Sequence, residues 1–304
     1  MADTPDMAGF RCLQLLRQGM AGGIPLFLVH GGKGNVLVFN DFAQRLAPKH
    51  SVYAFQWSGW DGGRGERSIP EMAQVYAAEI RRFNGDRPCR LGGNCVGGLI
   101  AIEIAKLLAK EGIEVREPLL VWDAPNLNSC SYRRREPWGD KKQMAALDRV
   151  KEGLLQCIPA AGTTGIVAQP EPCSPGLIGV LQRLPYMRRL VQRSKALLRI
   201  MPAYRARLSG QRVPMDVRQH YCIKVMLAAV RRHIGKPYKG DILYFRSFSI
   251  LGRDFGIPGW WDDLYLGFRE LCEGHFEAHV VGGQHNKVID AAGVVEIVNQ
   301  CLDI

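Results

Sequence analysis

The chain has 304 residues and a net charge of +11, and it is 47% hydrophobic and 23% charged, which excludes a disordered chain. It has no apolar run of the roughly 18 residues that a membrane span needs, and MADTPDMAGF at its start lacks the apolar segment of a secretory signal. Its nine cysteines are scattered, with no Cys/His ligand spacing. We therefore expect a cytoplasmic protein without membrane contact, bound cofactor, metal site or disulfide framework.

The first third of the chain alternates between short apolar runs and amphipathic stretches. Ser68 is typical of a helix N-cap and Gly85 of a helix end, and Gly112 closes a second helix. The predicted strands are 25–32, 50–57, 88–93 and 118–124, and the predicted helices are 39–47, 68–85 and 99–112. This order favours a mostly parallel sheet with helices on both faces.

The alternation of predicted strands and helices stops after residue 123 and resumes near residue 240. Between these points, prolines separate short basic helices, which we expect at 187–200 and 217–234. Strands are then predicted at 240–247 and 275–283, with a last helix over 290–302. We therefore predict one α/β core formed by 1–123 and 241–304, interrupted by a basic helical lid insertion over 124–240. Trp138, Tyr186, Tyr204 and Tyr221 are candidates for lining a channel under this lid or for its own core.

The positive charge is concentrated in the predicted lid. Residues 124–240 contain 22 Lys and Arg and 6 Asp and Glu, a local charge of +16, whereas the remaining residues sum to −5. This segment is either a solvated basic face or a surface that attracts an acidic partner. No nucleic-acid-binding motif accompanies the charge, so we expect no nucleic-acid partner.

A cysteine lies between glycines where a predicted strand meets a predicted helix, in the pentad Gly93-Asn94-Cys95-Val96-Gly97. The form G-x-C-x-G in this context predicts a nucleophile elbow, in which small neighbours allow a sharp turn that presents the central side chain. The alternatives are a buried structural cysteine and a phosphate-binding loop. The phosphate loop is disfavoured because the terminal Lys-Ser/Thr and the G-x-G-x-x-G order are missing.

A cysteine nucleophile requires an acid and then a base further along the chain. Asp123 ends the predicted strand LLVWD, and His285 lies in VVGGQHNKVID between the last strand and the last helix. If Cys95 is not a nucleophile, the alternative interpretation is that Asp123 is an ordinary helix N-cap and His285 a solvated loop residue. His30 precedes the nucleophile, and we expect it to be structural.

An oxyanion hole needs two backbone N–H groups. Val96, directly after the nucleophile, provides the first, and we expect Gly32, in the glycine-rich loop HGGKG, to provide the second.

These motifs resemble the thioesterase family of α/β-hydrolases that terminates polyketide and nonribosomal peptide assembly lines, including those of antibiotic biosynthesis. The resemblance extends from residue 24 nearly to the end and rests on PLFLVHGGKGNVLVF, SVYAFQWSGWDG, RLGGNCVGGLIAIEIAKLL, LLVWDAP and HFEAHVVGGQHNKVI. It implies Cys95 as nucleophile, Asp123 as orienting acid, His285 as base, and Gly32 with Val96 as the oxyanion hole. The family usually has serine in the elbow and a shorter lid.

The resemblance implies a substrate acyl, aminoacyl or peptidyl chain carried as a thioester on the phosphopantetheine of a carrier protein. Because an acyl-cysteine is itself a thioester, it keeps the chain activated for a thiol, amine or hydroxyl acceptor, in transfer or ring closure. We therefore expect an acyltransferase-like thioesterase. The alternatives are a hydrolytic thioesterase and a non-catalytic scaffold. We expect the chain to meet an acidic carrier protein in trans through its basic segment, as the donor, with a second carrier as an alternative acceptor.

Overall fold

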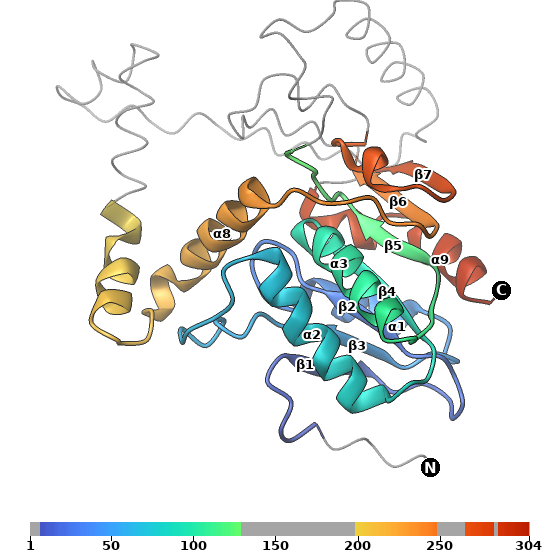
Figure 1. The fold of residues 1–304 in the computed structure, drawn as a ribbon, viewed down its shortest axis with the longest axis horizontal. Helices are drawn as coiled ribbons and strands as arrows, with labels where there is room; N and C mark the ends of the chain where they lie inside the picture. The colour runs from blue at the N-terminus through green and yellow to red at the C-terminus, as the bar shows by residue number, and fades with distance from the viewer. Residues whose placement is uncertain (1–6, 129–197, 248–264, 283–284, 304) are drawn as a thin grey trace, which may run out of the picture. The chain divides into compact units, whose positions relative to one another are not determined.

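The computed structural model describes residues 7–128, 198–247, 265–282 and 285–303. The chain divides into two compact units, Met1–Gly139 with Gln219–Ile304, and Asp140–Arg218. The first unit contains the sheet and its helices (Figure 1). The predicted limits of the lid, 124–240, remain a prediction, and most of that segment, including Trp138 and Tyr186, lies outside the described residues.

A seven-stranded sheet forms the centre of the first unit, in the order β1-β3-β2-β4-β5-β6-β7. Every neighbouring pair is parallel except β1 and β3, which confirms the predicted mostly parallel sheet. Because parallel strands end at one edge, the loops after β2, β4, β5 and β7 meet there. The strands are β1 (Leu13–Arg17), β2 (Leu26–Val29), β3 (Val52–Phe55), β4 (Cys89–Asn94), β5 (Val115–Trp122), β6 (Ile242–Ser247) and β7 (Phe276–Val281).

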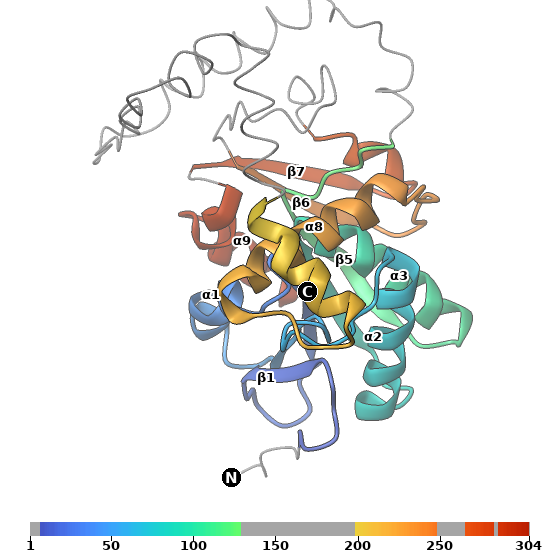
Figure 2. The ribbon, with the colours of Figure 1, turned by 90° about the vertical axis from the view of Figure 1, so that its left-hand side faces the viewer.

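Helices cover both faces of the sheet (Figures 1 and 2). On one face lie α2 (Ile69–Asn84) and α3 (Val96–Lys110), and on the other α1 (Asn40–Arg45) and α9 (Val294–Leu302). The alternation of strand side chains explains the two layers: Leu26 and Leu28 belong to the apolar cluster that contains α1 and α9 residues, whereas Phe27 contacts Phe83 of α2.

The start of α2 follows the sequence signals closely. Ser68 is the N-cap: its side chain accepts from the Glu71 N–H, while Glu71 accepts from the Ser68 backbone N–H at 3.2 Å. This capping box satisfies two N–H groups that no helical carbonyl can reach. Gly85, with φ of +63°, ends the helix as predicted.

The outer strand β1 has no counterpart among the predicted elements. Its register with β3 shifts between Leu15 and Arg17. The Glu79 carboxylate of α2 accepts from the backbone N–H groups of Arg11, Cys12 and Leu13, the last at 2.8 Å. This edge is therefore held to α2 by a side chain as well as to β3 by backbone pairing.

Beyond the predicted lid, strand and helix alternate again. The helix expected at 217–234 is α8 (Met215–Arg232), and its residues from Gln219 belong to the first unit. Of the helix expected at 187–200, only 198–200 fall on described residues, and these are helical. A short 3-10 helix, η4 (His285–Asp290), separates β7 from α9.

Candidate active site

The turn around Cys95 has a geometry that only small neighbours permit. Strand β4 ends at Asn94 and α3 begins at Val96, so Cys95 alone makes the turn, with φ of 54° and ψ of −121°. Non-glycine residues rarely adopt this backbone region, and such strain marks functional sites. A Cβ atom at Gly93 would collide with the Gly97 backbone, and one at Gly97 with the Val29 carbonyl. The glycines of the pentad are thus a steric requirement of the turn.

The structure brings Asp123 and His285 together. Asp123 follows β5, is fully buried and has a positive φ of 48°. His285 starts η4 after β7, and its Nδ1 lies 3.0 Å from Asp123 Oδ2. Nδ1–H donates to the carboxylate, which leaves Nε2 as the ring nitrogen for a second contact, and the imidazole also hydrogen-bonds the Cys95 side chain. The three predicted residues therefore form one chain of contacts.

Two opposite effects set the protonation of this chain. Burial disfavours the His285 imidazolium, but the electrostatic interaction with Cys95 and hydrogen bonds to Asp123 and Cys95 outweigh it and raise the pKa of His285 to about 10. Burial raises the pKa of the Asp123 carboxyl, whereas hydrogen bonding to His285 and the Arg246 charge reverse this and hold that pKa below its ordinary value. Asp123 is thus an anion that stabilises an imidazolium.

Two residues that the sequence did not single out complete the surroundings of Asp123. Arg246 Nη1 donates to Asp123 Oδ1 at 2.8 Å, and the Ser247 backbone N–H donates to the same oxygen at 2.8 Å. The Ser247 hydroxyl donates to Oδ2, the oxygen that faces His285. Both residues end β6, which is the parallel neighbour of β5. The sequence signal that could have pointed to them is that Arg246 and Ser247 are polar residues at the carboxyl end of a predicted strand.

A cavity of about 560 Å³ opens beside Cys95 and His285. Its other lining residues include Gly32, Asn94, Trp60 and Gln219 of α8. The Asn94 side-chain oxygen is buried and has no hydrogen-bond partner among the described residues. Lys33 and Lys287 also line this cavity, together with Asp41 and Asp290, so its wall carries charges of both signs.

Both expected oxyanion donors lie beside the cysteine. Val96 is the first residue of α3, so no carbonyl of a preceding turn is available to its N–H. Gly32 lines the same cavity as Cys95, and a Cβ atom added there would meet nothing within 4 Å among the described residues.

His30 is separate from this arrangement. It is fully buried, its Nε2 lies 2.8 Å from the Tyr76 hydroxyl, and its Nδ1 donates to the Gly31 carbonyl at 2.8 Å. Burial lowers the pKa of His30 to about 4, so it is neutral at physiological pH. These contacts join the loop after β2 to α2, as expected of a structural histidine.

The described residues contain no cluster of three or more His, Cys, Asp or Glu side chains placed to hold a metal ion. Within those same ranges, no helix is both long enough and apolar enough to cross a membrane. None of the described cysteines is in a disulfide; Cys12, Cys89, Cys222 and Cys272 are buried, whereas Cys95 and Cys301 are half-buried.

The architecture is that of an α/β-hydrolase, as comparison with solved structures shows. The chain is similar to the NocB thioesterase domain from the nocardicin cluster, with a TM-score of 0.56 and 18% identity over 96% of this chain and 99% of that one. It is also similar to the type II thioesterase BorB from the borrelidin biosynthetic cluster, with a TM-score of 0.53 and 15% identity over 96% of this chain and 97% of that one. At these identities the likeness establishes the fold.

Sequence comparisons show that one part of the chain is similar to thioesterase domains and to a biosynthetic synthase. Residues 24–162 match the family model of the thioesterase domain. Microperfuranone synthase of Emericella nidulans is 37% identical over 138 residues, which cover 44% of this chain and 14% of that protein. The chain therefore corresponds to a small part of this much longer relative.

Proposed function

We propose that the protein is a thioesterase-like acyltransferase in which Cys95 takes an acyl, aminoacyl or peptidyl chain from the phosphopantetheine thioester of a carrier protein. The observation that carries the proposal is the contact chain from Asp123 through His285 to Cys95, at the wall of one cavity. A nucleophile, a base and an orienting acid in hydrogen-bond contact are the groups that acyl transfer requires.

In the first half-reaction, the Cys95 thiolate attacks the thioester carbonyl. The resulting oxyanion accepts hydrogen bonds from the backbone N–H groups of Gly32 and Val96. Collapse breaks the bond to the phosphopantetheine sulfur, which leaves with a proton from the His285 imidazolium. The chain is then a thioester on Cys95. The raised pKa of His285 supports this step, because the imidazolium is present as the proton donor at neutral pH.

In the second half-reaction, the acceptor attacks the acyl-cysteine while neutral His285 takes its proton, and the Cys95 thiolate leaves. Asp123 stabilises the imidazolium that forms and fixes its orientation. The acyl-cysteine is a thioester like the donor, so loading changes the free energy little and the chain stays activated. This chemistry favours a thiol, amine or hydroxyl acceptor over water.

The test is incubation with acyl-loaded carrier protein, followed by intact-mass spectrometry of both proteins. We expect a covalent adduct on Cys95 that decays faster when a second carrier thiol or an amine is added. Decay at the same rate in plain buffer contradicts the transferase and identifies a hydrolytic thioesterase. The absence of any adduct, with binding of the carrier retained, identifies a non-catalytic scaffold.

A further inference from the structure

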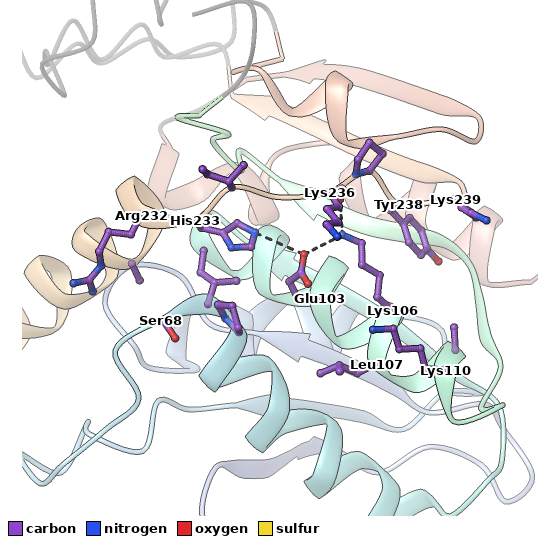
Figure 3. Close-up of a pocket in the computed structure, with 16 residues that line it drawn as sticks. Ser68, Glu103, Lys106, Leu107, Lys110, Arg232, His233, Lys236, Tyr238 and Lys239 are labelled. Carbon is purple, nitrogen blue, oxygen red and sulfur yellow. Dashed lines mark hydrogen bonds and ion pairs between the residues drawn. The ribbon is translucent and has the colours of Figure 1, made fainter. Parts of the chain in front are cut away.

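A second cavity, of about 880 Å³, lies away from Cys95 against the helical layer of the first unit (Figure 3). It is formed by the start of α2, the second half of α3 and the segment from the end of α8 to residue 239. Six of its lining side chains are basic and one, Glu103, is acidic; the basic ones are Lys106, Lys110, Arg232, His233, Lys236 and Lys239. We call this the basic cleft.

Specific contacts fix the shape of the basic cleft. Figure 3 shows Glu103 between Lys106, whose Nζ lies 2.9 Å from the Glu103 carboxylate, and His233, at 3.7 Å. Lys106 also donates to the Lys236 carbonyl, which joins α3 to the segment after α8. The Asn128 amide donates to the His233 carbonyl at 2.6 Å. The cleft is therefore preformed, which lowers the entropic cost of binding.

The charge of the basic cleft is only partly neutralised. Glu103 is shared by Lys106 and His233, and burial lowers the pKa of His233, so this histidine contributes little charge at neutral pH. The side chains of Lys110 and Lys239 are exposed, and neither has a carboxylate partner within the described parts of the chain. The rim thus carries net positive charge that a binding partner can neutralise.

The distribution of groups favours a protein surface over a small anion. A small-anion site needs donors that converge at depth, whereas these lysines stand around an exposed rim. Between them lie apolar groups, including Ile234, which is 67% exposed, Leu107 and Pro237. An apolar centre with a charged rim is the anatomy of a protein interface, and it matches a helix with carboxylates on its flanks.

We infer that the basic cleft is the docking surface for the acidic carrier protein; this rests on the proposed function. Helix α3 connects the two sites, since it starts directly after Cys95 and its residues Glu103 and Lys106 line the cleft. At a rise of 1.5 Å per residue, Lys106 lies about 16 Å along the helix from Cys95. A carrier seated in the cleft presents its flexible arm toward the cavity at the other end of the helix.

The test compares two double charge reversals. K110E/K239E changes the exposed rim, and the control K49E/R64E changes two exposed basic residues that line neither cavity. We measure the Kd for apo-carrier protein by fluorescence anisotropy, and acyl transfer to Cys95 from the loaded carrier and from a small thioester without a carrier. We expect K110E/K239E to weaken carrier binding about tenfold and to reduce its salt dependence. The control variant and the small thioester should behave as in the wild type.

Three outcomes overturn the inference. If the two double variants bind the carrier with equal affinity, docking lies elsewhere. If K110E/K239E loses as much transfer from the small thioester as from the loaded carrier, the substitutions act on the catalytic cavity. If inorganic pyrophosphate raises the Tm of the wild type but not of K110E/K239E, and carrier affinity is the same in both, the cleft is a small-anion site. Failure of the proposed function is distinct: then no thioester acylates Cys95, while the binding measurement still reports on the cleft.

Discussion

Asp123 and Arg246 form a buried ion pair at the carboxyl ends of two neighbouring strands, with 2.8 Å between Oδ1 and Nη1. The Asp123 side chain is fully buried and that of Arg246 is 10% exposed. One carboxylate oxygen thus holds the arginine, while the other holds His285. Arg246 is therefore a positioning residue that acts on the candidate base through Asp123.

Replacing Arg246 with methionine should destabilise the protein by about 3 kcal/mol at pH 7, because it removes one of the two cationic groups, Arg246 and His285, that contact the buried Asp123 carboxylate. The low pKa of Asp123 contributes stability above its unfolded value of 3.8, and this contribution is lost as the pH falls through the folded pKa. The difference between the two proteins should therefore shrink in acid. Urea unfolding at several pH values measures this difference in the free energy of unfolding. Arg246→Lys, which keeps the charge, is the control. Equal stability of Arg246→Met and wild type at pH 7 contradicts the assignment.

Replacing Asp123 with asparagine should lower the rate of acyl transfer by roughly 10²- to 10⁴-fold, since the imidazolium loses its counter-ion and its fixed tautomer. The pKa of His285 should fall from about 10, because Asp123 contributes to raising it. The stability that the raised pKa provides is present below the ordinary value of 6.5 and is lost as the pH rises through 10. Titration of the His285 ring by NMR checks the direction. A pKa unchanged in Asp123→Asn argues against the coupling.

Replacing Cys95 with serine should convert transfer into slow release. The acyl-serine is an oxyester, which holds less free energy than the donor thioester and does not reacylate a thiol readily. Product analysis with a loaded carrier and a second carrier thiol distinguishes the two fates, and Cys95→Ala provides the baseline. Unchanged transfer to the second thiol in Cys95→Ser would refute our explanation for the cysteine.

Replacing Gly93 with alanine should destabilise the fold by about 3 kcal/mol, because the new methyl group meets the Gly97 backbone, which cannot move aside. Gly282→Ala is the matched control, since a Cβ atom there meets nothing within 4 Å and its φ is not positive. Thermal unfolding compares the two. Equal Tm values in the two variants contradict the steric explanation of the pentad.

The sequence predicted the central strands and the long helices correctly because their signals are local. Ser68, Gly85 and the apolar run within 50–57 each specify the structure of their own segment. The outer strand β1 was missed because four of its five residues are only half-buried, so its hydrophobic pattern is weak. Helix α3 begins at Val96, three residues before the predicted Leu99, because the elbow places the helix start immediately after Cys95.

The candidate site was predicted in part for the same reason. Cys95, Asp123 and His285 each follow a strand in a fixed chain order, so a motif could locate them, and the structure places them in contact. Arg246 and Ser247 could not be found in this way. Polar residues end many strands, and only the pairing of β5 with β6 shows that these two face Asp123.

The contacts of Glu79 with the start of β1 have a consequence for self-association. An outer strand offers free N–H and C=O groups to which another chain can add a strand, the first step of amyloid-like aggregation. Here the Glu79 carboxylate accepts from the N–H groups of Arg11 and Cys12, which precede β1, and of Leu13, its first residue, and the register of β1 with β3 shifts between Leu15 and Arg17. The Glu79 carboxylate therefore leaves fewer N–H groups at the start of β1 to which another strand could be added.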